Sequence, residues 1–135
     1  MIYKNLHLRI YLILFFICAN SILSTQVQLI TAHKKSNGVL LRVVTNSIID
    51  IENIAGWKGQ ENWFYLTLNG SYLSPKALEE LQFELPLLNI EITENNQSVQ
   101  IGYLFNTPIE DYEIFHSSAS RVLLVQIWES LSDSL

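Results

Sequence analysis

The feature that most constrains the fold is a match between two parts of the chain that lie sixty residues apart. The segment TNSIID at 45–50 falls on FNTPIED at 105–111 when the sequence is shifted by sixty positions. With one loop residue omitted, WFYLTL at 63–68 then lies over VLLVQI at 122–127. Because the order of strands and loops is kept through the match, the sequence predicts a structural repeat with approximate twofold symmetry.

Short apolar or alternating segments separated by turn signals fill most of the chain. VLLRVVT at 39–45 and SVQIGYLF at 98–105 have the pattern of strands, and GWKGQEN at 56–62 that of a loop. SPKALEELQFE at 74–84 predicts the one short helix, with Ser74 as its cap. These patterns indicate an all-β fold, a small β-sandwich of two pseudo-symmetric halves with three to four strands each. Since such a half cannot bury its apolar face alone, we expect the two halves to pack face to face.

The first residues differ from the rest. Lys4 and Arg9 precede an apolar run at 10–19, followed by small and polar residues. This order predicts a secretory signal peptide at 1–24, with an uncleaved membrane anchor as the alternative. Cys18 follows Ile17, which does not fit a lipid-attachment motif. We expect a lead-in segment at 25–37, the sandwich domain at 38–129 and a polar tail at 130–135.

The charge balance limits the partners. Without Lys4 and Arg9 the chain has 6 Lys and Arg against 13 Asp and Glu, a net charge of −7. Such a domain repels phosphate backbones, so we expect no nucleic acid partner, and membrane contact only through the N-terminal segment.

The two repeated units, LLRVVTNSIIDIENI…WFYLTL and VQIGYLFNTPIEDYEIF…RVLLVQI, carry a resemblance to a known family. Residues 38–129 resemble the AMIN domain, found at the N-terminus of exported bacterial cell-wall amidases and of type IV pilus and secretion secretins. That family often has an arginine early in the first strand of the second unit, where this chain has Gly102 and Tyr103. The resemblance implies a periplasmic β-sandwich that targets envelope machinery, with peptidoglycan as the ligand.

Residues after 24 show no signature of catalysis. His33 and His116 stand apart from each other and from any cysteine, so they predict no metal site. There is no Gly-x-Ser-x-Gly elbow and no glycine-rich phosphate loop. Glu110 and Asp111 are neighbours on a predicted strand and point to opposite faces. We therefore expect no catalytic residue, no metal and no cofactor, and a protein that is not an enzyme.

Four residues are candidates for ligand binding. Trp57 lies between glycines, and its ring could stack on a sugar face or fold back over the edge of the core. Asn46 and Asn106 could bind a glycan, although turn formation explains them equally well. Arg42 interrupts an apolar strand, in a structural or a binding role.

Two functions are compatible with these features. The first is a non-catalytic, exported, periplasmic domain that binds peptidoglycan or localises cell-envelope machinery. The alternative is a protein–protein interaction subunit of a secretin, type IV pilus or secretion assembly, for which exposed strand edges would suit strand addition.

Overall fold

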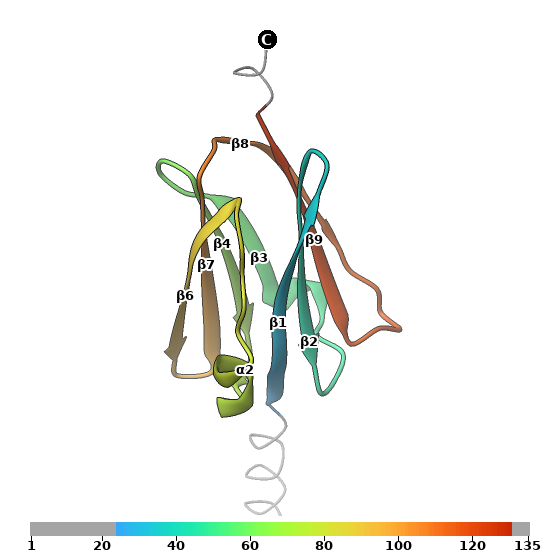
Figure 1. Cartoon of the computed structure of the whole chain (residues 1–135). Coiled ribbons are helices and arrows are strands. Elements are labelled where there is room, and N and C mark those ends of the chain that lie inside the picture. Colours follow the sequence, from blue (N-terminus) through green and yellow to red (C-terminus); the bar gives the residue numbers. More distant parts are fainter. Residues whose placement is uncertain (1–23, 131–135) are drawn as a thin grey trace, which may run out of the picture.

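The computed structural model describes residues 24–130 as two β-sheets that face each other across one core (Figure 1). The strands are β1 (Thr25–Lys35), β2 (Gly38–Thr45), β3 (Ile54–Lys58), β4 (Trp63–Asn69), β5 (Ser71–Leu73), β6 (Leu87–Asn95), β7 (Ser98–Phe105), β8 (Ile109–Phe115) and β9 (Val122–Glu129). The helical elements are the 3₁₀ turn η1 (Ile51–Asn53) and the helix α2 (Pro75–Glu79). The predicted all-β sandwich with one short helix is confirmed. The predicted signal peptide, apart from its last residue, and the polar tail, apart from its first residue, lie outside the described residues.

Each sheet contains strands from both halves of the chain. Sheet A has the order β5-β1-β2-β9-β8, and sheet B has the order β3-β4-β7-β6. By the shift of sixty residues and the order of the strands, β1 corresponds to β6, β2 to β7 and β4 to β9, and by its pairing β3 corresponds to β8. The halves are therefore interlocked: each gives one strand pair to each sheet. The expectation that each half forms one layer is wrong, because a strand pair of one half finds its hydrogen-bonding neighbours in the other.

The turns that follow β2 and β7 are equivalent, as the repeat predicts. The N–H of Asn46 donates to the carbonyl of Gln26 at 3.0 Å, and the N–H of Asn106 donates to the carbonyl of Pro86 at 2.9 Å. Gln26 and Pro86 are themselves sixty residues apart. The two turns lie in different sheets and at opposite ends of the sandwich (Figure 1).

The first strands of the two halves are also equivalent in detail. The ladder between β1 and β2 shifts register between Val27 and Leu29, and the ladder between β6 and β7 shifts between Leu87 and Asn89. Val27 is fully buried, so the sandwich begins at β1 and includes the predicted lead-in segment.

The sequence match fails at the outer strands β3 and β8. The shift of sixty places Ile54 on Ile114, but Ile54 pairs with Leu68 while Tyr112 pairs with Ile127. Ile54 is therefore the structural counterpart of Tyr112. The reason is η1, which lengthens the connection in the first half.

The core lies between the sheets and takes alternate side chains from the long strands. Its fully buried members are Val27, Ile30, Leu41, Phe64, Leu66, Leu68, Val99, Ile101, Tyr103, Phe105 and Ile127. The side of the sandwich between β3 and β8 is closed by polar contacts. The hydroxyl of Tyr112 donates to the carbonyl of Gly56 at 2.9 Å, and Nζ of Lys58 donates to the carbonyl of Glu110 at 3.3 Å.

The helix α2 lies next to β1 at the end where that strand begins (Figure 1). Ala77 is fully buried there, and the backbone N–H of Ser74 donates to the carbonyl of Val27 at 2.9 Å. Ser74 occupies the cap position as predicted, but its side chain makes no capping hydrogen bond. Within residues 24–130 no helix has the length and apolar character needed to cross a membrane.

The interlocked topology predicts equal and cooperative effects at equivalent core positions. Leu41 and Ile101 are both fully buried, one at the centre of β2 and the other at the centre of β7. We expect Leu41→Ala and Ile101→Ala each to lower the free energy of unfolding by about 3 kcal/mol. Urea denaturation should keep one transition in both variants, and two separated transitions would contradict interlocked halves. The surface variant Glu91→Ala is the control and should change stability by less than about 0.5 kcal/mol.

Tyr103 predicts a stabilising substitution. Its hydroxyl is buried in the core and has no hydrogen-bond partner among the described residues. Because an unpaired buried hydroxyl is costly, Tyr103→Phe should raise the free energy of unfolding by about 1 kcal/mol.

The same residue predicts a dependence on alkaline pH. Burial raises the pKa of the Tyr103 hydroxyl far above its ordinary value. Above about pH 10 the unfolded chain loses this proton and the folded chain keeps it, so stability falls as pH rises. Between pH 8 and pH 11, the urea midpoint of unfolding should fall less in Tyr103→Phe than in the wild type. An equal fall in both proteins would assign the alkaline loss to other groups.

Candidate functional site

Three aromatic rings lie side by side on the outer face of sheet B. Trp57 on β3 pairs with Tyr65 on β4, and their ring centroids are 5.6 Å apart at an interplanar angle of 27°. Trp63 stacks on the same tyrosine at 5.8 Å and 9°. Trp57 is 40% exposed, and the other two rings are half-buried. We call Trp57, Tyr65 and Trp63 the aromatic platform.

Two glycines give the platform its shape. A Cβ atom at Gly102 would lie 3.1 Å from Cε1 of Tyr65 and 3.2 Å from Cζ3 of Trp63, so both rings rest on the backbone of β7. On the other side a Cβ atom at Gly59 would overlap Cε2 of Tyr65. Tyr65 therefore lies close between the backbone at Gly102 and the backbone at Gly59.

The position of Trp57 differs from the sequence prediction. The two glycines around it predict a loop, but Gly56 and Trp57 belong to β3. The strand continues because the backbone of β3 pairs with β4 as far as Lys58. The ring of Trp57 points away from the core and stacks on Tyr65. It therefore does not fold back over the edge of the core, which was one of the two orientations that the sequence left open.

The other three candidates are not part of the platform. Arg42 points outward from the centre of sheet A, on the opposite side of the sandwich. Asn46 stabilises the turn after β2, because its Oδ1 accepts a hydrogen bond from the N–H of Gln26 at 2.8 Å. The equivalent position to Gln26 is Pro86, which has no N–H, so Asn106 has no matching side-chain bond. The structure therefore brings none of the four candidates together.

The histidines also lie apart. His116 contacts the carbonyl of Ile49 at 2.5 Å through Nε2, which ties the loop before β9 to the chain after β2. His33 lies on the outer face of β1, 3.4 Å from the hydroxyl of Thr31. Residues 24–130 contain no group of three potential metal ligands among His, Cys, Asp and Glu.

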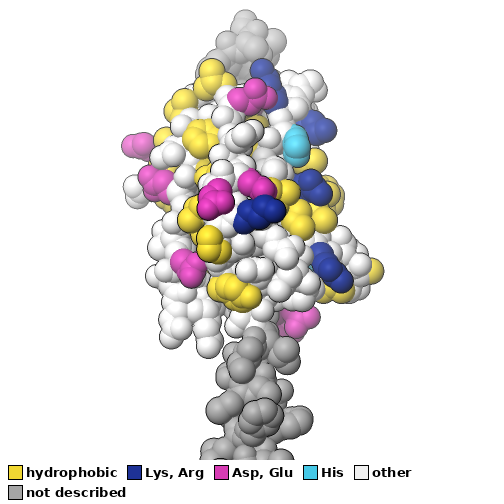
Figure 2. Space-filling view, turned by 60° about the horizontal axis from the view of Figure 1, so that its bottom comes forward, with side chains coloured by type: hydrophobic (Ala, Val, Ile, Leu, Met, Phe, Trp, Pro, Cys, Tyr) yellow, Lys and Arg dark blue, Asp and Glu magenta, His cyan; other side chains and the backbone are white. Residues whose placement is uncertain are grey.

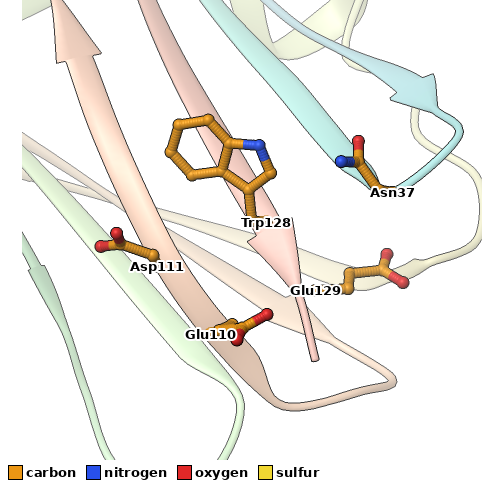
Figure 3. Close-up of a pocket in the computed structure, with 5 residues that line it drawn as sticks. All are labelled: Asn37, Glu110, Asp111, Trp128 and Glu129. Carbon is orange, nitrogen blue, oxygen red and sulfur yellow. The ribbon is translucent and has the colours of Figure 1, made fainter. Parts of the chain in front are cut away.

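A pocket of about 310 Å³ lies at the end of β9. Figure 3 shows its lining side chains around this strand end: Asn37, Glu110, Asp111, Trp128 and Glu129. Because three carboxylates and no basic side chain line this pocket, it disfavours anionic ligands. The pocket joins an indole ring to polar groups but holds no buried polar side chain that would fix a ligand, so the platform is the stronger site.

Charged side chains are unevenly distributed. In the view of Figure 2, most Lys, Arg and His side chains lie toward the right, and most Asp and Glu side chains lie toward the centre and the left.

Sequence reasoning missed Trp63, Tyr65 and Gly102. The signal was present in WFYLTL, where Trp63, Tyr65 and Thr67 alternate with the buried Phe64, Leu66 and Leu68. This alternation places two of its rings on one outer face. The contribution of Gly102 has no sequence signal, because it depends on which strand lies next to β4.

Comparison of the chain with known protein families, with curated proteins and with solved structures found no match.

The packing against Gly102 predicts a spectroscopic change. In Gly102→Val the new side chain would push the rings of Tyr65 and Trp63 off β7. We expect weaker near-UV circular dichroism and a red-shifted tryptophan emission, since the rings lose their fixed stack and gain solvent. Gln100→Val is the control, because Gln100 points outward from the same strand and already has a side chain. An unchanged near-UV spectrum in Gly102→Val would contradict this packing.

Proposed function

We propose that this chain is a non-catalytic, exported module that binds the glycan strands of peptidoglycan through the aromatic platform. The observation that carries the proposal is the stack of three rings on the solvent side of a sheet. Large aromatic side chains contribute most to stability when they are buried, so an exposed Trp57 beside two half-buried rings on an outer face supports a binding role for this surface.

The chemistry of the platform suits sugar rings. The C–H groups of a pyranose form a flat apolar face with hydroxyls around its rim, and an aromatic ring offers a matching flat surface. The hydroxyl of Tyr65 and the indole N–H groups of Trp57 and Trp63 supply polar groups at the edges of the platform. The contact needs no charge, so the acidic balance of the domain does not oppose it.

Further support comes from the sequence. The predicted signal peptide at 1–24 would deliver the domain to the periplasm, where peptidoglycan lies. The resemblance of residues 38–129 to the AMIN domain implies the same ligand class and a role in localising envelope machinery.

Sedimentation with purified sacculi tests the proposal. We expect the wild type to sediment with sacculi at low salt, and with glycan strands from which the stem peptides have been removed. Trp57→Ala should weaken both interactions about tenfold, equal to about 1.4 kcal/mol, which is in the range of an aromatic stack. A wild type that stays in solution with both materials would exclude glycan binding.

Tyr72→Ala is the matched control. Tyr72 has the same exposed fraction as Trp57, 40%, but lies on β5 in the other sheet. Its removal should leave sedimentation unchanged. If Tyr72→Ala weakened binding as much as Trp57→Ala, the binding would be a general effect of exposed aromatic rings.

The second candidate is a subunit that contacts a secretin or pilus protein. Strand addition is the less suitable route. The edge strands β6 and β8 both contain a bulge, and beside it Asn89 and Asp111 accept the N–H of the next residue at 2.9 and 2.8 Å. Bulges and occupied N–H groups protect sheet edges from added strands. A protein partner would therefore bind a sheet face, and the outer face of sheet A has the more apolar centre.

A further inference from the structure

The outer face of sheet A is apolar at its centre. Its two central strands, β2 and β9, direct Leu40 and Val44, and Val122 and Leu124, away from the core. An antiparallel sheet with one solvated face normally alternates apolar and polar residues. These strands instead direct mostly apolar residues to the outer face as well, with Arg42 and Gln126 as the polar exceptions.

Basic residues flank this apolar centre on one side, and acidic residues flank it on the other. His33 and Lys35 point outward from β1, while Asp111 and Glu113 point outward from β8. The register places them in common rows across the sheet. Lys35, Gly38, Trp128 and Asp111 form one row, and His33, Leu40, Gln126 and Glu113 form the next.

We propose that the outer face of sheet A binds a second copy of itself, about a twofold axis that runs parallel to the strands between β2 and β9. This axis lays β1 of one copy over β8 of the other and keeps each residue in its row. Lys35 then faces Asp111 of the second copy, and His33 faces Glu113. In an isologous pair of this kind each contact occurs twice.

The apolar residues fit the same arrangement. Val44 faces Val122 of the second copy, and Gly38 faces Trp128, so the smallest residue of the face meets the largest. Arg42 has no hydrogen bond or ion pair within residues 24–130. In the pair, Glu113 of the second copy lies one strand to the side of Arg42 and one row along the sheet. A long side chain such as that of Arg42 spans this diagonal distance.

The alternative twofold axis is unfavourable. An axis across the strands would lay β1 over β1 and β8 over β8 with the order of the rows reversed, so the basic residues of one copy would not meet the acidic residues of the other. The axis along the strands also keeps the strand directions parallel, so both copies begin β1 at the same end.

Charge reversal tests the proposal with two variants of the full chain. One replaces the basic side (His33→Glu with Lys35→Glu), and the other replaces the acidic side (Asp111→Lys with Glu113→Lys). In each variant alone both flanks of the pair carry like charges. In an equimolar mixture both flanks carry opposite charges again.

Analytical ultracentrifugation under reducing conditions, which exclude a Cys18 disulfide, gives the readout. We expect the wild type to sediment as a dimer. Each variant alone should dimerise at least about tenfold more weakly, and the mixture should recover a dimer with one copy of each. A wild type that is monomeric would overturn the proposal, and the outer face of sheet A would then bind a different partner. A mixture of folded variants that stays monomeric would also overturn it.

Two controls keep the test specific. Glu91→Lys with Thr93→Lys changes two outward positions of β6 in sheet B and should leave the dimer intact; loss of the dimer there would overturn the assignment to sheet A. Asp111 accepts the N–H of Tyr112, so folding is checked by circular dichroism. If that variant unfolds, Glu113→Lys and His33→Glu, alone and mixed, repeat the test.

Discussion

Both sheets depend on a central strand pair that joins the two halves of the chain. In sheet A this pair is β2 with β9, and in sheet B it is β4 with β7. Because each pair takes one strand from each half, neither sheet has a centre unless both halves are present. The core between the sheets then places the same demand on both repeats: apolar side chains at the inward positions of the central strands. This demand explains why the repeat is visible mainly in apolar residues.

The outward positions are free of that demand, and there the two halves have diverged. Gly102 takes the place of Arg42, while Trp63 and Tyr65 take the places of Val122 and Leu124. The same fold thus presents two different surfaces: the aromatic platform on sheet B, and on sheet A a mostly apolar face with basic residues on one side and acidic residues on the other. They lie on opposite sides of the sandwich, so a pair formed through sheet A would leave two platforms free. Two linked platforms would bind a polymeric ligand more tightly than one.

The sequence predicted the fold class and the turn equivalence well, because alternation and turn residues are local signals that the core preserves. It predicted the outer strands less well. Two glycines around Trp57 indicate a loop, yet β3 forms because its backbone hydrogen bonds with β4 outweigh the flexibility of glycine. The equivalence of Ile54 and Ile114 failed since η1 lengthens one connection and moves the register of the edge strand.

The sequence alone determined that the chain repeats, that it is all-β, and which residues alternate into a core, since these depend on residue type and spacing. Only the tertiary structure decided how the halves interlock and which residues share a surface. Pairing between distant strands brings Gly102 beneath Tyr65 and Trp63, and places Lys35 in one row with Asp111. Alternation shows that two residues point to the same side of their own strand. It does not show which strand lies beside them, and that neighbour creates the site.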